Sequence, residues 1–131
     1  FQRILVDAPC SGTGTLARNP EIRWRLQPDD LVRAHSRQTA MLRAALAQLG
    51  RDGRLVYATC SLEPEENEQV VREAISQEPG VRIVRSEDAL RPWLRSCAEA
   101  AGLFDDEGFF RTFPPESGTD GFFAAVLEQS G

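Results

Sequence analysis

Two cysteines lie in short motifs that each follow an apolar run. The motif DAPCSGTG (residues 7–14) follows the run ILV, and the motif ATCS (residues 58–61) follows the run LVY. Each run is typical of a short buried strand, and the segment between the two motifs is typical of a helix. A strand, a helix and a second strand in this order predict a parallel pair of strands joined by a crossover.

Both motifs are therefore expected at the carboxyl ends of adjacent strands, the edge where open α/β sheets bind their ligands. Neighbouring strands lie about 4.8 Å apart. We expect Asp7, Cys10 and Cys60 to share one pocket, although fifty residues separate the two thiols. One acid and two thiols suit a reaction that passes through a covalent thiol adduct.

The remaining patterns predict an α/β domain. Strands are expected at residues 2–7, 54–59, 81–84, 108–113 and 121–127, a long loop at 8–27, and helices at 28–49, from 64 to a stop at 79–80, and at 87–101 with an interruption near Pro92. The last two strands are expected to form an antiparallel hairpin at the end of a mostly parallel sheet. Their four phenylalanines, Phe109, Phe110, Phe122 and Phe123, are expected in the core. No GxGxxG sequence is present, so the chain is interpreted as the second half of a doubly wound domain.

Composition predicts one soluble domain of 131 residues, with 41% hydrophobic and 27% charged residues and no apolar run that approaches the roughly 20 residues of a membrane span. No signal peptide is recognised, and Phe1 is interpreted as an internal position of a longer protein. Three cysteines without a CxxC pair, and one histidine, argue against a metal site and a disulfide framework. Reduced thiols favour a cytoplasmic location.

Charge is distributed unevenly along the chain. Residues 1–57 hold nine arginines and five acids, whereas residues 58–131 hold six arginines and fifteen acids, and the net charge is −5. A free-standing RNA-binding protein is usually basic overall. If RNA is the substrate, we expect the basic first half to face it.

Four motifs in order resemble those of one enzyme family, the bacterial ribosomal RNA cytosine-5 methyltransferases of the Rsm B/Sun/NOL group. The matching segments are DAPCSGTG (7–14), RNPEIRW (18–24), TCS (59–61) with Glu63, Glu66 and Asn67, and Arg111 and Pro114 with DGFFA (120–124). The resemblance covers nearly the whole chain. It implies that residues 1–131 are a partial Rossmann-like catalytic domain, and that the cofactor-binding strands and an RNA-binding region lie upstream.

The resemblance also implies a reaction: transfer of a methyl group from S-adenosylmethionine to C5 of a cytosine in RNA, most closely 16S ribosomal RNA. It implies that Cys60 is the nucleophile that adds to C6 of the base, and that Cys10 assists release of the adduct. Asp7 is implied to face the base and the methyl donor, with Pro9 beside the donor. The fragment alone is expected to be inactive, because it needs the upstream half of its own domain.

Each of these residues also has a plainer interpretation. Taken singly, Cys60 is better explained as a small buried residue that ends a strand, and Cys10 as a loop residue that packs under the sheet; the motifs around them favour the catalytic roles. The two roles could be exchanged, but the Thr-Cys sequence after the second strand argues against it. Asp7 is alternatively a cap that binds backbone amides of the next turn. Pro9, Gly12 and Gly14 are expected to let backbone approach a flipped base.

The basic residues around Trp24 are expected to contact RNA: Arg18, Arg23 and Arg25 suit phosphate, and Trp24 suits stacking on a base. The alternative is that Trp24 packs inward. Asp120 is interpreted as a turn residue and Cys97 as a structural residue on a helix, and His35 is assigned no role.

Two other functions are considered. The chain could be a non-catalytic remnant that contributes only to RNA binding or ribosome assembly; the retention of Asp7 and both thiols favours the enzyme. The second is a thiol-disulfide protein that uses Cys10 and Cys60, but the CxxC motif typical of that class is absent from the sequence. The loop after the first strand also differs from the Asn/Asp-Pro-Pro-aromatic loop of amino-directed methyltransferases.

Overall fold

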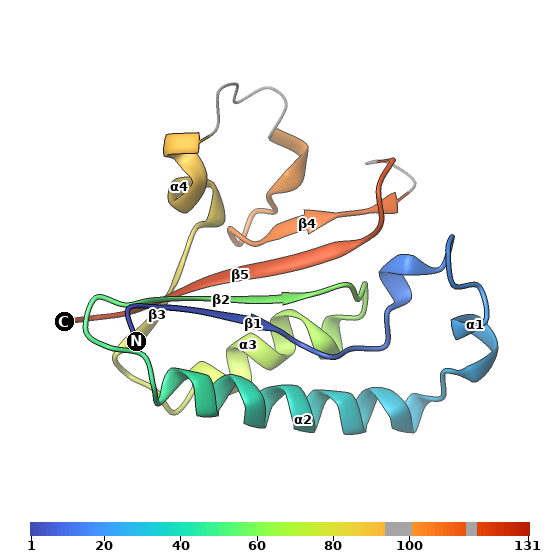
Figure 1. Ribbon diagram of the computed structural model, residues 1–131, viewed down its shortest axis with the longest axis horizontal. Helices are drawn as coiled ribbons and strands as arrows, with labels where there is room; N and C mark the ends of the chain where they lie inside the picture. Colours follow the sequence, from blue (N-terminus) through green and yellow to red (C-terminus); the bar gives the residue numbers. More distant parts are fainter. Residues whose placement is uncertain (94–100, 115–117) are drawn as a thin grey trace.

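A five-stranded mixed sheet with two helices packed on one face organises the protein (Figure 1). The computed structural model describes residues 1–93, 101–114 and 118–131. The strands are β1 (Arg3–Asp7), β2 (Arg54–Thr59), β3 (Val81–Val84), β4 (Phe110–Thr112) and β5 (Phe122–Gln129). The helices are α1 (Ile22–Arg25), α2 (Pro28–Leu46), α3 (Glu68–Ile75) and α4 (Ser86–Leu90). Four 3-10 turns cover Thr13–Thr15, Pro64–Glu66, Arg91–Trp93 and Ala101–Leu103.

The sheet has one strand that runs against all the others. β1 and β2 are parallel, with Asp7 level with Ala58, which confirms the predicted crossover. β5 is antiparallel to β2 on one side and to both β3 and β4 on the other. β1 to β4 therefore share one direction. The predicted antiparallel pair of the last two strands is confirmed, but β5 lies inside the sheet between β2 and β3, not at its end.

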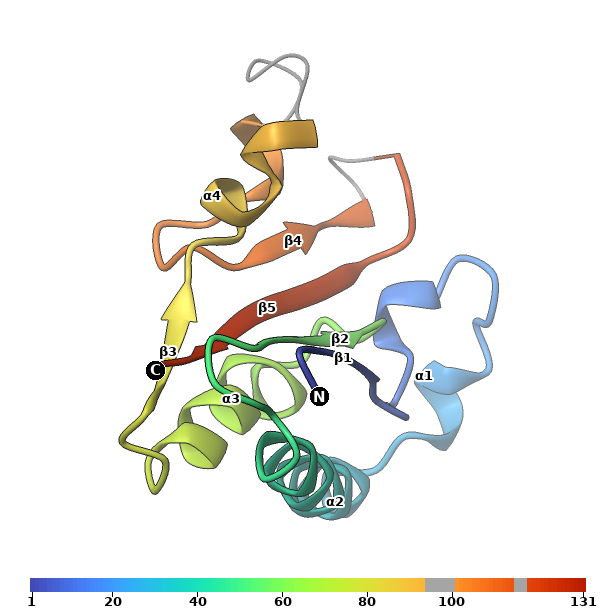
Figure 2. The same cartoon turned by 60° about the vertical axis from the view of Figure 1, so that its left-hand side comes forward.

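The core lies between the sheet and the layer formed by α2 and α3 (Figure 2). Alternate residues of each strand face this layer, and Leu55, Tyr57, Phe123 and Leu127 are almost completely buried there. The alternation also corrects one prediction. Phe109 and Phe123 are 1% exposed, but Phe122 is 44% exposed because consecutive strand residues point to opposite faces.

Helix α2 begins where the sequence indicates. Gln27 and Asp30 form a capping box around Pro28, and the Gln27 amide donates to Asp30 Oδ2 at 2.8 Å. Leu42 and Leu46 carry its apolar stripe into the core. The helix ends at Leu46, three residues before the predicted end.

Three local predictions differ from the structure. The loop expected at 8–27 contains a 3-10 turn and the short helix α1. The helix expected from Pro64 is a 3-10 turn followed by α3, because the side chain of Asn67 is held by Thr59 and Ser61 and the backbone at Asn67 is not helical. Strand β1 is less buried than predicted: Leu5 is 70% exposed, because it lies on the face away from α2 and β1 is an edge strand of the described sheet.

Among the described residues, no helix combines the length and apolar character that crossing a bilayer requires.

Candidate active site

The two cysteine motifs meet at the carboxyl ends of β1 and β2. The Sγ atoms of Cys10 and Cys60 lie 3.3 Å apart, within hydrogen-bonding distance for sulfur, and both residues are partly buried. The parallel pairing of β1 and β2 brings this about, because it places the residues that follow Asp7 and Thr59 side by side. The juxtaposition of two thiols predicted from the sequence is therefore present.

Backbone hydrogen bonds of Gly14 link the loop after β1 to the end of β2 and to the start of β5. Its amide donates to the carbonyl of Cys60 at 2.9 Å, and its carbonyl accepts from the amide of Gly121 at 2.7 Å. A Cβ at residue 14 would clash with the carbonyl of Gly121 and lie 2.7 Å from that of Cys60. The backbone that approaches Gly14 is thus the protein's own, which corrects the expectation that Gly14 makes room for a base. Gly12 has φ +75°, a conformation that favours glycine.

The two thiols have different surroundings. Burial, followed by the hydrogen bond with Cys60, raises the pKa of the Cys10 thiol to about 12. Cys10 therefore keeps its proton at neutral pH. When Cys60 is ionised, Cys10 is the donor in the S–H···S contact between them.

Asp7 occupies the last position of β1, but it is not joined to the thiols by any described contact. Its side chain is exposed and makes no hydrogen bond with the described residues, so the interpretation of Asp7 as a cap is wrong. Alternation along β1 places Asp7 on the face of Leu5, whereas Val6 faces α2. The pocket expected to hold all three residues is therefore not formed by the described residues.

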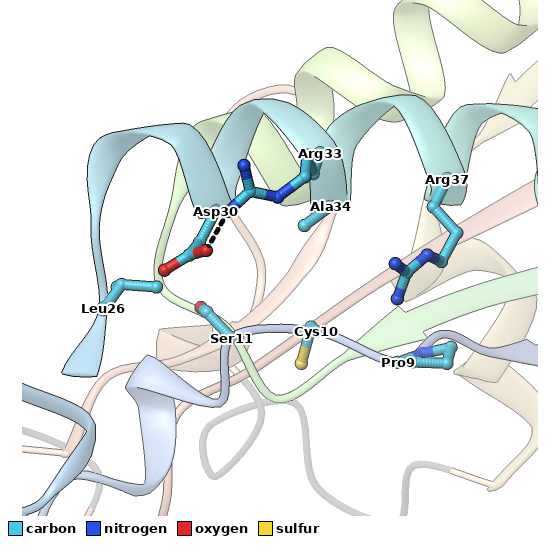
Figure 3. A pocket seen from close by; sticks show the side chains of 8 residues that line it. All are labelled: Pro9, Cys10, Ser11, Leu26, Asp30, Arg33, Ala34 and Arg37. Carbon is cyan, nitrogen blue, oxygen red and sulfur yellow. Dashed lines mark hydrogen bonds and ion pairs between the residues drawn. The ribbon is translucent and has the colours of Figure 1, made fainter.

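A cavity of about 250 Å³ lies between α2 and the loop that carries Cys10. Figure 3 shows Arg33, Ala34 and Arg37 of α2 above Pro9–Ser11. Arg33 is ion-paired with Asp30, and Arg37 forms no ion pair or hydrogen bond with a described residue. Neither arginine was predicted to belong to the site, although their i, i+4 spacing places them on one helix face.

The residues expected to contact RNA lie on and before α1. Trp24 is 80% exposed, so the alternative that it packs inward is wrong. Arg23 and Arg25 are exposed and form no ion pair with a described residue, whereas Arg18 pairs with Asp120. Asp120 also accepts a hydrogen bond from Thr112 Oγ1 through its backbone carbonyl, as suits a turn residue.

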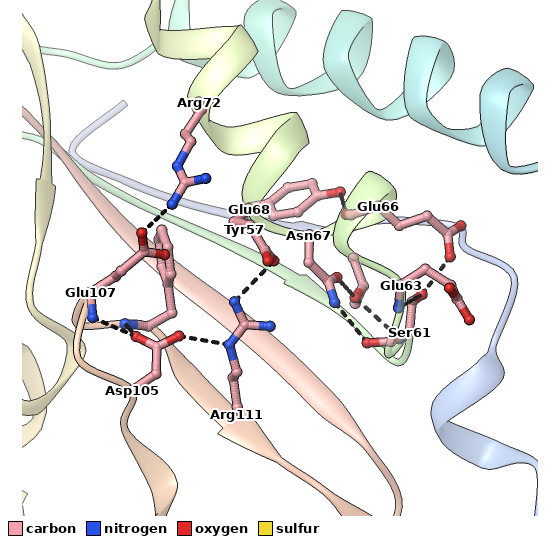
Figure 4. Close-up of polar contacts among 12 residues, drawn as sticks. Tyr57, Ser61, Glu63, Glu66, Asn67, Glu68, Arg72, Asp105, Glu107 and Arg111 are labelled. Atoms are coloured by element: carbon pink, nitrogen blue, oxygen red, sulfur yellow. Dashed lines mark hydrogen bonds and ion pairs between the residues drawn. The ribbon is translucent and has the colours of Figure 1, made fainter.

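Other residues named from the sequence have structural partners. Arg111 bonds Glu68 at 2.9 Å and Asp105 at 2.7 Å (Figure 4). Its guanidinium also lies over the ring of Phe123. His35, which was assigned no role, bonds the Glu65 carbonyl and the Glu73 carboxylate. Cys97 lies outside the described residues. Within the described part of the chain, no group of three or more His, Cys, Asp or Glu side chains is placed to hold a metal ion.

Comparison with known proteins identifies the family. The family described as 16S rRNA methyltransferase RsmB/F matches residues 1–128. The chain belongs to the RsmB/F methyltransferase family. One similar relative is ribosomal RNA small subunit methyltransferase B from Vibrio cholerae, which is 36% identical over 98% of this chain and 26% of that protein. The protein of the same name from Thermus thermophilus is 35% identical over 98% of this chain and 29% of that protein.

Solved structures have the same fold as this RsmB/F chain. The crystal structure of PH0851 has a TM-score of 0.81 and 35% identity over 98% of this chain and 26% of that one. The crystal structure of NSun6 from Pyrococcus horikoshii with SFG has a TM-score of 0.72 and 27% identity over 97% of this chain and 29% of that one. The fold is thus part of a Rossmann-like S-adenosylmethionine-dependent methyltransferase domain. The chain spans between a quarter and a third of the length of these relatives.

Proposed function

We propose that this chain carries the two catalytic thiols of an RNA cytosine-5 methyltransferase and acts as part of a longer protein. The observation that carries the proposal is the Cys10–Cys60 pair, in which one thiol of raised pKa lies 3.3 Å from the other. Membership of a 16S rRNA methyltransferase family supports RNA, and ribosomal RNA in particular, as the substrate.

The chemistry needs a nucleophile because C5 of cytosine is itself a poor one. Cys60 Sγ forms a bond to C6, and the electron pair of the C5–C6 double bond then makes C5 able to attack a methyl group. S-adenosylmethionine supplies that electrophilic methyl group when bound. A base, water in the simplest case, then accepts the C5 proton. The electron pair of the C5–H bond restores the C5–C6 double bond as the bond from C6 to Cys60 Sγ breaks, and the sulfur leaves with its electron pair.

Cys10 assists the release of the methylated base. Its raised pKa keeps the thiol protonated at neutral pH, and its sulfur lies next to the sulfur that must leave C6. A hydrogen bond from Cys10 stabilises the developing negative charge on Cys60. The raised pKa also argues against Cys10 as the nucleophile, because a thiolate is the reactive form of cysteine.

Asp7 and Pro9 fit a role in holding the methyl donor and the base. The Asp7 carboxylate is exposed and has no hydrogen-bonding partner among the described residues, so it is available to a ligand. S-adenosylmethionine carries a sulfonium and an ammonium group, and SFG, its analogue, is named in the NSun6 structure. By sharing a proton with N3 of the base, a carboxyl group at Asp7 would also offset the negative charge that builds on that edge.

The surface around α1 is proposed to bind the RNA. Trp24 offers an exposed ring for stacking, and Arg18, Arg23 and Arg25 offer positive charge beside it. Because relatives are three to four times longer, the remaining contacts to RNA and cofactor are proposed to come from upstream parts of the protein.

The test uses the complete protein that carries this chain. The Cys10→Ala variant is mixed with S-adenosylmethionine and substrate RNA and run on a denaturing gel. We expect a slow-migrating protein–RNA adduct that disappears when Cys60→Ala is added, whereas Cys97→Ala alone forms no stable adduct. Absence of any adduct, together with unchanged methylation by Cys60→Ala, would show that the two-thiol mechanism is wrong.

A further inference from the structure

The carboxylate of Glu66 is completely buried and has only neutral hydrogen-bond donors around it. Oε1 accepts from the Ser11 amide at 2.8 Å and from Gln38 Nε2 at 3.1 Å. Oε2 accepts from the hydroxyls of Ser11 and Ser61, both at 2.5 Å. None of the described arginines or the histidine forms an ion pair with it. Burying a carboxylate is costly unless it is fully hydrogen-bonded, so this arrangement calls for a function.

The donors to Glu66 come from both thiol-bearing loops. Ser11 directly follows Cys10, and Ser61 directly follows Cys60. One carboxylate oxygen thus bonds to the residue after each cysteine. Figure 4 shows Glu66 on the 3-10 turn that precedes α3, with a bond to Ser61.

Gln38 adds a third element to the same contact. It is 1% exposed, and its Nε2 donates both to Glu66 and to the carbonyl of Pro9 at 2.9 Å. Cys10 is therefore held on both sides, through Pro9 by Gln38 and through Ser11 by Glu66. In this way α2 and the 3-10 turn before α3 fix the loop that follows β1.

We propose that Glu66 is a positioning residue that holds the Cys10 and Cys60 thiols at their contact distance, with Gln38 as its support. The proposal rests on the two-thiol reaction described above and adds the residue that sets its geometry. The loops belong to positions fifty residues apart, and displacements of about 1 Å are enough to impair a catalytic pair. Glu66 touches neither thiol directly, so it acts through Ser11 and Ser61.

The thiol separation is measured without reference to methylation. In a Cys97→Ser background, the chain is equilibrated with reduced and oxidised glutathione. Closure converts the two thiols into one disulfide and reduces oxidised glutathione to two molecules of glutathione. The equilibrium gives the effective concentration of one thiol at the other. We expect this concentration to fall at least about tenfold in Glu66→Ala, and much less in Glu66→Gln, whose amide keeps the length of the side chain.

Glu63→Ala is the matched control, because Glu63 lies three residues away and its carboxylate forms no hydrogen bond with a described residue. Circular dichroism verifies that each variant is folded. If Glu66→Ala does not fold, the double variant Ser11→Ala/Ser61→Ala replaces it. It removes both hydroxyl bonds to Oε2 and keeps the bonds to Oε1, although it also removes the bond from the Glu63 amide to Ser61 Oγ. A folded variant whose effective concentration stays within about twofold of the parent would overturn the proposal.

Activity separates this inference from the proposed function. In the complete protein, we expect Glu66→Ala to lower kcat with little change in KM for RNA, with partial rescue by Glu66→Gln. Equal loss of kcat in Glu66→Ala and Glu63→Ala would contradict a specific role of Glu66. If the thiol equilibrium shifts as expected but the parent protein forms no 5-methylcytosine, the positioning role stands and the proposed function fails.

Discussion

Sγ of Cys10 lies 3.3 Å from Sγ of Cys60, and the two atoms belong to loops that follow adjacent parallel strands. Backbone bonds on either side of the contact support it alongside Glu66. The amide of Ala8 bonds the carbonyl of Ala58, and the amide of Gly14 bonds that of Cys60, both at 2.9 Å. The thiols are therefore held at a fixed separation by two parts of the chain that are far apart in sequence.

Cys10 is expected to react slowly with alkylating reagents even at alkaline pH. Burial is the largest cause of its raised pKa and remains when Cys60 is replaced. In Cys60→Ser/Cys97→Ser, the rate of alkylation by iodoacetamide should keep rising with pH beyond the ordinary thiol value of 9.0. The same variant unfolded in urea serves as the control, and its rate should level off near that value. A folded protein that levels off at the same pH would show that burial does not shift Cys10.

Gly14→Ala is expected to destabilise the fold by about 2–3 kcal/mol, because the added methyl group has no space between two backbone segments. It would clash with Gly121 and crowd the carbonyl of Cys60. Gly102→Ala is the control, since a Cβ at residue 102 has no atom within 4 Å. Urea denaturation of both variants gives the free energies of unfolding. Equal values for the two would contradict the close packing at Gly14.

The His35–Glu73 pair is expected to make stability depend on pH. Partial burial lowers the pKa of His35, but the hydrogen bonds to Glu73 and to the Glu65 carbonyl outweigh it and raise the pKa above 6.5. The folded state therefore binds the proton more tightly than the unfolded state. The stabilisation is fully present below pH 6.5 and is lost as the pH rises through the raised value.

Thermal unfolding of the parent and of His35→Gln between pH 5.5 and 8.5 tests this dependence. The difference in Tm between the two proteins should be largest at the acidic end and shrink as the pH rises. At still lower pH the pair weakens again, when Glu73 is protonated through its own lowered pKa. A difference that does not change with pH would show that the bond does not involve the charged imidazole.

Trp24→Ala is expected to weaken RNA binding by the complete protein by about tenfold or more, because a stacked base is lost. The side chain is 80% exposed, so the free energy of unfolding should change by less than about 0.5 kcal/mol. Val32→Ala, which removes another exposed apolar side chain, is the control. Fluorescence anisotropy with labelled RNA measures the affinity. Equal affinities of Trp24→Ala and the parent for RNA would show that Trp24 does not contribute to RNA binding.

Local pattern was sufficient for most of the secondary structure. The apolar runs before Asp7 and Cys60, and the Pro28 start of α2, predict these elements because short-range preferences and periodicity agree there. The turn at Pro64–Glu66 was not predicted as separate from α3. Its cause is a set of side-chain bonds from Asn67 to the end of β2, which a local pattern does not contain.

Residue patterns along the chain were sufficient to predict which strands the two thiols follow, the parallel crossover that brings those strands together, and the family to which the motifs belong. The folded structure was needed to show that β5 inserts between β2 and β3, that Phe122 is exposed while Phe123 is buried, and that Asp7 lies on the face away from α2. It also decided the surroundings of the Glu66 carboxylate, whose donors Ser11, Gln38 and Ser61 lie in three separate segments. The physical reason is that strand order and buried hydrogen bonds depend on which distant segments pack together, whereas the alternation of side chains is a local property of the backbone.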